Sequence, residues 1–173
     1  MVKKSKLMIY LLKNKLKTMR IAIGSDHAGF KLKHTFIEEL NRMGYEVFDK
    51  GVDRNDISAD SYHLIGASVA EAVAKNEVDR GIVICGTGIG ISIAANKVPG
   101  ADCALCNDLF TASTSRLHNK ANILAIGARI VGEYLALEIL RTWLTTSYEG
   151  GRHESRNKNL RIIEKRYGSH LDK

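Results

Sequence analysis

The sequence predicts an α/β fold: a single Rossmann-like doubly wound domain, in which helices cover both faces of a five-stranded parallel sheet. Short apolar runs of strand length alternate along the chain with segments whose apolar residues recur every three or four positions. The loops between these segments are mostly short, as is typical of crossovers between parallel strands. The composition fits one domain with a sizeable core, since the 173 residues are 45% hydrophobic and 26% charged.

Strands and helices are expected to alternate after residue 19. The strand-like runs are residues 20–24, 45–48, 81–85, 101–105 and 122–127. Helical spacing of apolar residues marks residues 32–43, 62–73, 89–98, 110–117, 131–143 and 154–167. Gly44 and Pro99 come directly after two of these segments, where helices commonly end. Residues 49–61 are polar and are expected to form a longer loop.

The third strand leads into a loop with glycine at every second position. Cys85 ends the apolar run, and Gly86, Gly88 and Gly90 follow. Glycine lets backbone N–H groups approach a ligand closely, and the start of the next helix adds partial positive charge. The sequence therefore predicts a cradle for a small oxyanion. At its edge, the same dipoles favour a Cys85 thiolate that could act as a base or a nucleophile.

The spacing of this loop argues against two common nucleotide sites. It reads G-x-G-x-G rather than G-x-G-x-x-G, and the chain contains no G-x-x-x-x-G-K-[ST]. Packing as a small hydrophobe is the alternative interpretation of Cys85. For Cys103 and Cys106 we favour such packing, because their C-x-x-C pair lacks a second pair of metal ligands and lies in an apolar run.

The net charge of +7 is concentrated at the N-terminus. Residues 1–19 contain six lysines and no acidic residue, and removing these six charges leaves +1 for residues 20–173. A nearly neutral folded part argues against nucleic-acid binding, which needs basic side chains on the fold itself. Residues 1–18 are expected to be a disordered basic extension, and residues 19–173 the domain. Three cysteines without a signal-peptide or membrane-spanning run predict a cytoplasmic protein with free thiols and no membrane association.

In doubly wound sheets, ligands bind beyond the carboxyl ends of the strands. Asp26 and His27 follow the first strand, Asn107 and Asp108 follow the fourth, and Arg129 follows the fifth. Together with the glycine loop after the third strand, these residues are expected to rim one crevice. An acid, an imidazole, a thiol and a cation around an oxyanion cradle suit proton transfer on an anionic substrate.

Four motifs across residues 20–160 carry a resemblance to a known family. They are residues 24–30 (GSDHAGF), residues 85–97 (CGTGIGISIAANK), residues 115–119 leading to 127–129 (SRLHN and GAR), and residues 148–156 (YEGGRHESR). In this order they resemble the ribose-5-phosphate isomerase B family, a group of sugar-phosphate isomerases that also includes galactose-6-phosphate isomerase. Together the motifs are far more specific than any one of them.

The resemblance implies interconversion of ribose 5-phosphate and ribulose 5-phosphate through an enediolate, in the pentose phosphate pathway and without metal or cofactor. Cys85 matches the family's base, and the amides of residues 86–90 would hold the enediolate charge. Thr87 would relay a proton between the two substrate oxygens. His118 matches the ring-opening histidine, and Asp26 would assist it by binding the sugar hydroxyls.

The resemblance also implies how the substrate is held. The phosphate would contact His27, Arg152 and Arg156, with Arg129 as a further contributor. The other substrate-binding residues would be Tyr62, Gly86, Gly88, Gly90, Ser92 and Asn119. In this family the site lies between two subunits, with the histidine and arginine segments partly supplied by the neighbour. A homodimer or a dimer of dimers is therefore implied.

Structural roles remain open for several of these residues. Asp26 could cap the helix that follows it, and residues 118–119 could form a solvated helix end. Ser92 could satisfy backbone groups, and Arg152 and Arg156 could form an exposed charged face. The other histidines are assigned to the surface or to structure: His34, His63, His153 and His170.

Residues 61–63 depart from the family pattern. They read Ser-Tyr-His where members commonly carry Asp-Tyr-Pro, which leaves the geometry of residues 53–63 open. An isomerase for galactose or allose 6-phosphate is therefore an alternative. A non-catalytic sugar-phosphate-binding module with the same glycine loop is another.

Overall fold

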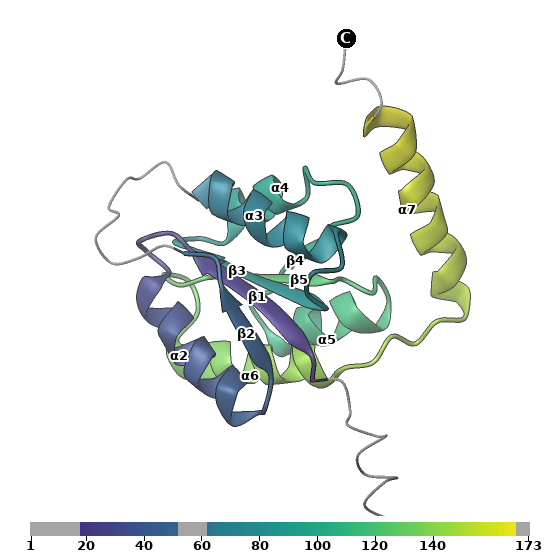
Figure 1. Ribbon diagram of the computed structural model, residues 1–173. Helices are drawn as coiled ribbons and strands as arrows, with labels where there is room; N and C mark the ends of the chain where they lie inside the picture. The colour runs from purple at the N-terminus through teal and green to yellow at the C-terminus, as the bar shows by residue number, and fades with distance from the viewer. Residues whose placement is uncertain (1–17, 52–61, 169–173) are drawn as a thin grey trace, which may run out of the picture.

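A computed structural model describes residues 18–51 and 62–168, so the expected basic extension lies outside it apart from Thr18. Five parallel strands form one sheet in the order β2-β1-β3-β5-β4. The strands are β1 (Arg20–Ser25), β2 (Glu46–Asp49), β3 (Arg80–Cys85), β4 (Cys103–Leu105) and β5 (Ile123–Gly127). The helices are α2 (Phe30–Arg42), α3 (Tyr62–Ala74), α4 (Ile89–Ala95), α5 (Leu109–Leu117), α6 (Glu133–Thr145) and α7 (Arg152–Gly168). The predicted doubly wound parallel sheet is confirmed (Figure 1).

The strands β1, β3, β4 and β5 send alternate side chains into two separate cores. In β3, Ile82 and Ile84 pack in the core under α2, α5 and α6, whereas Val83 and Cys85 pack in the core under α3 and α4 (Figure 1). This alternation follows from the two-residue period of a strand. Because helices cover both faces, the strands are apolar on both sides, which explains their continuous hydrophobic runs.

Two details of the helices differ from the prediction. α4 ends at Ala95 rather than at residue 98; the next residue, Asn96, exchanges two side-chain hydrogen bonds of 2.9 and 2.8 Å with the backbone of Cys103. In α6, the predicted core residue Leu135 is 39% exposed, whereas Ala136 and the residue one turn on, Leu140, are fully buried. The other predicted core positions, Val131, Ile139 and Trp143, are buried, so only Leu135 departs from the expected apolar face.

α7 stands apart from the two helical layers (Figure 1). An Arg161–Asp102 ion pair tethers it to the residue before β4, and Glu164 Oε1 accepts a 2.9 Å hydrogen bond from Gly100 N. Its apolar side chains are largely exposed: Leu160, Ile162, Ile163 and Tyr167. Within the described ranges, no helix is both long and apolar enough to cross a membrane.

A buried carboxylate joins α2 to α6. Glu39 is 7% exposed, and its oxygens accept hydrogen bonds of 2.7 Å from Arg141 Nε and 2.9 Å from Arg42 Nε. The hydrogen bond from Arg141 has the largest effect on Glu39, followed by the one from Arg42. Together they lower the pKa of Glu39 from 4.5 to about 2. The fold therefore stabilises the charged carboxylate.

We expect Glu39→Gln to destabilise the protein by about 2 kcal/mol near neutral pH, because Arg42 loses its buried anionic partner and Arg141 keeps only its ion pair with Glu138. Since folding lowers the pKa of Glu39, its contribution is complete above pH 4.5 and is lost as the pH falls towards 2. Urea unfolding of parent and variant, near neutral pH and again near pH 3, should show the difference shrinking in acid. Glu38→Gln, at an exposed neighbouring position, is the control; an equal loss there would contradict the assignment.

Candidate active site

The glycine loop after β3 requires glycine for steric reasons. Gly88 has φ = +77°, and a Cβ there would lie 2.4 Å from Leu105 Cδ1 and 2.9 Å from Gly127 N. The loop is thus pressed against β4 and β5, and its own backbone forms the rim of the site. A Cβ on Gly90 would lie 2.8 Å from Tyr62 Cε2, so the tyrosine ring closes over the start of α4.

The Cys85 thiol faces this loop. Its Sγ accepts a hydrogen bond from Gly88 N at 3.1 Å, and its side chain is 6% exposed. The sulfur atom therefore lies against the backbone of the glycine loop. All three cysteines are free, and burial raises the pKa of the other two thiols, Cys103 and Cys106, which keeps them protonated. Among the described thiols, only Cys85 adjoins the glycine loop.

Asp26 lies beside the loop but is partly occupied by structure. Its Oδ1 accepts hydrogen bonds from Ala28 N at 2.9 Å and Gly29 N at 3.1 Å, and its residue is 7% exposed. The Asp26 carboxylate therefore closes the turn before α2 and does not cap the helix, because the N-cap residue is Gly29 and has no side-chain cap. Asp26 N also donates to Ile84 O, which ties this turn to β3. His27 is exposed next to it.

The loop after β5 packs against the glycine loop from the other side. Arg129 N donates to Gly86 O at 2.9 Å, and a Cβ on Gly86 would lie 3.6 Å from Arg129 Cδ. The Arg129 guanidinium is thereby held above Gly86. Tyr62 and Arg129 thus flank the glycine loop. Residues 52–61, which include Ser61 of the departure from the family pattern, lie outside the described residues, whereas His63 is exposed in the first turn of α3.

Three polar residues at this edge differ in how free their side chains are. Thr87 is exposed, and its hydroxyl accepts a weak hydrogen bond of 3.3 Å from Ile89 N. Ser92 is buried, and its hydroxyl donates a 2.8 Å hydrogen bond to Ile89 O. This is the structural role that the sequence left open, in which Ser92 satisfies a backbone carbonyl. Asp108 caps α5 by accepting a 2.7 Å hydrogen bond from Thr111 N, so a structural role explains it.

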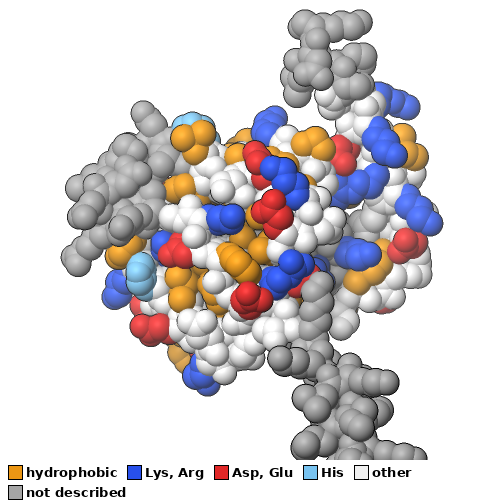
Figure 2. Space-filling view, in the orientation of Figure 1, with side chains coloured by type: hydrophobic (Ala, Val, Ile, Leu, Met, Phe, Trp, Pro, Cys, Tyr) orange, Lys and Arg blue, Asp and Glu red, His pale blue; other side chains and the backbone are white. Residues whose placement is uncertain are grey.

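A second group of predicted site residues lies beyond the amino ends of the parallel strands, which we call the amino edge; the Cys85 loop lies at the carboxyl edge. α5 runs back from the carboxyl end of β4, so His118 and Asn119, which follow it, lie near the amino ends of the strands (Figure 1). Asn119 lines a cavity of about 520 Å³ together with Arg80, the first residue of β3. Arg152 and Arg156 begin α7 beyond this edge, and Lys and Arg side chains gather along α7 (Figure 2).

The residues that follow β1, β3 and β5 therefore lie at one end of the sheet, whereas His118, Asn119 and the start of α7 lie at the other. Arg80 and Cys85 are the two ends of β3, and a strand of six residues spans roughly 16 Å. The sequence places residues along the chain but does not show that a returning helix carries its end to the far edge. The chain presents two half-sites: a Cys85 group at the carboxyl edge and a His118 group at the amino edge.

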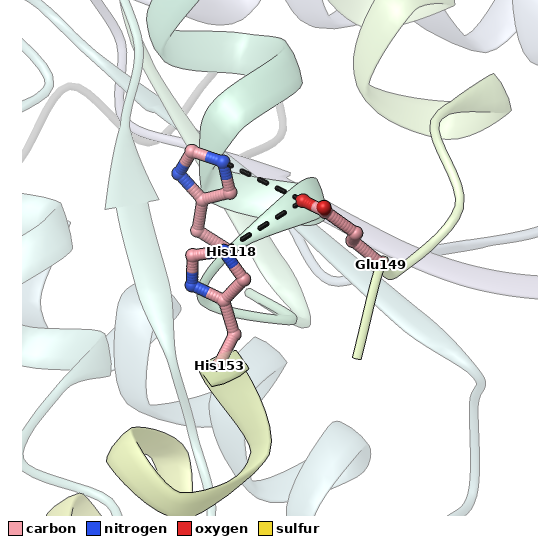
Figure 3. Close-up of side chains that lie close together, drawn as sticks. All are labelled: His118, Glu149 and His153. Carbon is pink, nitrogen blue, oxygen red and sulfur yellow. Dashed lines mark ion pairs between the residues drawn. The ribbon is translucent and has the colours of Figure 1, made fainter. Parts of the chain in front are cut away.

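The His118 group contains two residues that the sequence reading did not select. Glu149 Oε2 lies 3.8 Å from His118 Nε2 and 3.6 Å from His153 Nε2, and the two imidazole rings stack with centroids 4.2 Å apart (Figure 3). His153 is 4% exposed, which excludes the surface role. Burial has the largest effect on His153 and lowers its pKa. The nearby His118 and Arg152 lower it further through electrostatic repulsion, so the neutral imidazole is favoured. The signal in the sequence was Gly150-Gly151, whose positive φ angles turn Glu149 towards α5.

Comparison with known proteins identifies the family. The model of the Ribose/Galactose Isomerase family matches residues 21–160. The chain belongs to this family. Among relatives, ribose-5-phosphate isomerase B of Escherichia coli is 48% identical over 150 residues, which cover 85% of this chain and 97% of that protein. D-erythrulose-4-phosphate isomerase of Pectobacterium atrosepticum is 40% identical over 136 residues, covering 77% and 87%.

Solved structures of ribose/galactose isomerases agree with the fold. Ribose-5-phosphate isomerase B of Clostridium thermocellum superposes with a TM-score of 0.83 at 52% identity, covering 86% of this chain and 99% of that chain. The predicted family and the predicted fold are both confirmed. The roles of the individual site residues remain predictions.

Proposed function

We propose that this ribose/galactose isomerase interconverts ribose 5-phosphate and ribulose 5-phosphate through an enediolate intermediate. The observation that carries the proposal is the Cys85 thiol at the carboxyl end of β3, which accepts the N–H of Gly88 at the rim of a glycine loop. The relatives from E. coli and C. thermocellum, named ribose-5-phosphate isomerase B, support this substrate. The reaction would belong to the pentose phosphate pathway, and a cytoplasmic location would suit it.

The Cys85 group supplies the proton transfer. The Cys85 thiolate would take the C2 proton of the open-chain aldose, so that the electrons move onto the C1 carbonyl oxygen and form the enediolate. Amides of residues 86–90 would hold this charge, and each such donor typically contributes about 3 kcal/mol. Thr87 would pass the hydroxyl proton from O2 to O1. Return of the carbon-bound proton from Cys85 to C1 then gives the ketose and regenerates the thiolate.

The His118 group acts before this step, because ribose 5-phosphate is mostly a closed ring. An imidazole transfers protons well near neutral pH, so His118 would move a proton between the anomeric hydroxyl and the ring oxygen. Asp26 Oδ2 would bind a sugar hydroxyl. The phosphate would be gripped by cations that the two groups supply, namely His27 and Arg129 from one, and Arg152 and Arg156 from the other.

The two groups call for a second copy of the chain. They lie at opposite edges of one sheet, roughly 16 Å apart, which exceeds the reach of one pentose phosphate. A two-fold axis that sets the His118 edge of one chain against the Cys85 edge of its partner would create two identical complete sites. The exposed apolar side chains of α7 support this, because a partner would cover them. We therefore propose a homodimer or a dimer of dimers.

A coupled isomerase assay tests the substrate. We expect kcat/KM to be highest for ribose 5-phosphate when it is compared with D-erythrulose 4-phosphate and with galactose and allose 6-phosphates. A clear preference for a tetrose or a hexose phosphate would replace the substrate within the same chemistry. Activity should persist in the presence of a chelator, since no step requires a metal. Phosphosugar binding without any turnover would favour the binding-module alternative.

A further inference from the structure

Three side chains that commonly bind metals meet at the amino edge of the sheet. One ligand atom from each of His118, Glu149 and His153 lies within 4.8 Å of the others (Figure 3). The Glu149 oxygen is 3.8 and 3.6 Å from the two imidazole nitrogens. Tetrahedral zinc with bonds of about 2.0–2.1 Å places neighbouring ligand atoms about 3.3 Å apart. Binding one ion would need shifts of a few tenths of an ångström between the Glu149 oxygen and each nitrogen. The two imidazole rings, now only 8° from parallel, would also tilt so that both nitrogens point at the ion.

The backbone around the cluster is already fixed. Glu149 N donates to Leu117 O at 3.0 Å, which holds the segment before α7 against the end of α5. Asn157 Nδ2 of α7 donates to His118 O at 3.0 Å and also to Tyr148 Oη at 3.0 Å. Three segments distant in the sequence are thus locked together by hydrogen bonds. Such a set loses little conformational entropy when it binds an ion.

The donor set selects the kind of ion. Two imidazoles with one carboxylate suit zinc and similar transition metals, whereas calcium and magnesium prefer oxygen ligands alone. His153 Nε2 accepts a 3.3 Å hydrogen bond from Arg152 Nε, so this nitrogen carries a lone pair that can bind a metal. Arg152 is exposed and can turn away. A tetrahedral ion with these three ligands would keep one coordination position for water or a substrate oxygen.

We propose that His118, Glu149 and His153 bind one zinc-class divalent cation per chain, and that this ion inhibits the isomerase. Inhibition follows because the ion occupies the His118 nitrogen that would carry the proton in ring opening. In this proposal the ion is an inhibitor and not a cofactor, and activity is expected to persist in the presence of a chelator. Inhibition rests on the proposed function, whereas binding of the ion does not.

Binding is tested first, by titrating the full chain with Co²⁺ and following its visible absorption, and with Zn²⁺ by calorimetry. The parent should bind one equivalent per chain. Glu149→Gln and His153→Gln should each weaken metal binding by at least about tenfold. Replacing a residue that only hydrogen-bonds to a metal ligand already costs about this much, so loss of a ligand itself should cost no less. Glu133→Gln and His34→Gln, at exposed positions elsewhere, are matched controls and should bind like the parent. Failure of the parent to bind, or equal binding by all four variants, would refute the site.

Inhibition is tested by adding Zn²⁺ to the ribose 5-phosphate assay, with each variant compared with its own metal-free rate. The parent should lose activity reversibly, and excess chelator should restore it, while Glu149→Gln and His153→Gln should resist the metal. Equal inhibition of parent and variants would show that the ion acts elsewhere, for example at the Cys85 thiol. An inactive parent that still binds Co²⁺ at this cluster would overturn the proposed function and leave the ion site intact.

Discussion

Cys85→Ala is expected to lower kcat for ribose 5-phosphate by about a thousandfold, because a positioned general base typically contributes between a hundredfold and ten-thousandfold. The enediolate cannot form unless a group next to C2 accepts its proton. Alanine removes that acceptor and leaves the glycine loop in place, since a methyl group occupies less space than the buried thiol. Phosphosugar binding, measured by calorimetry, should therefore change little. Steady-state kinetics in the coupled assay measure kcat and KM separately.

Cys103→Ala is the matched control for this variant. Its thiol is half-buried at the start of β4, at the far end of the sheet, and burial raises its pKa so that it stays protonated. The control should keep nearly full activity. Unchanged turnover in Cys85→Ala would remove the base assignment. Loss of phosphosugar binding together with turnover would instead indicate a structural role for Cys85.

The sheet could be predicted from sequence because each strand satisfies a local rule. Residues such as Ile82, Val83 and Ile84 are apolar in succession, which only a strand covered on both faces requires. Boundaries were less certain, since side-chain contacts decide them: Asn96 bonds the backbone of Cys103, and α4 ends three residues early. Periodicity in α6 gave the right helix but placed Leu135 on the wrong face.

The half of the site that follows the strands was predictable for the same reason. Asp26, Cys85 and Arg129 come directly after parallel strands, so the topology alone brings them to one edge. Spacing in the sequence could not show how each side chain is used there. Asp26 closes a turn through Oδ1, and this structural role uses only one of its two carboxylate oxygens.

The other half depended on geometry that no local pattern records. His118 ends a helix that returns across the sheet, so its place at the amino edge follows from the direction of α5 and not from its neighbours in sequence. Glu149 and His153 meet it only because Gly150 and Gly151 adopt positive φ angles before α7. A cluster assembled from a helix end, a turn and a second helix becomes visible only in three dimensions.

Mixing two inactive variants should restore activity if the site is shared between chains. Cys85→Ala and His118→Gln should each be nearly inactive alone. In a two-fold dimer that contains one chain of each, one site combines an intact Cys85 with an intact His118, and the other site carries both changes. Random mixing should therefore recover about a quarter of the parent's activity. Coexpression with two different affinity tags, or refolding of a mixture, provides the mixed assemblies for the assay.

The choice of partners makes this prediction specific to the two half-sites. Cys85→Ala mixed with Thr87→Val should recover nothing beyond the activity of the separate variants, because both residues belong to the same edge of the same chain. A site complete within one chain would give no recovery in either mixture, and the shared site would then be wrong. Recovery in both mixtures would mean that the chains exchange the Cys85 group itself, which the parallel pairing of β3 between β1 and β5 does not allow. Recovery with His118→Gln alone would therefore place the ring-opening and proton-transfer groups of one site on two different chains.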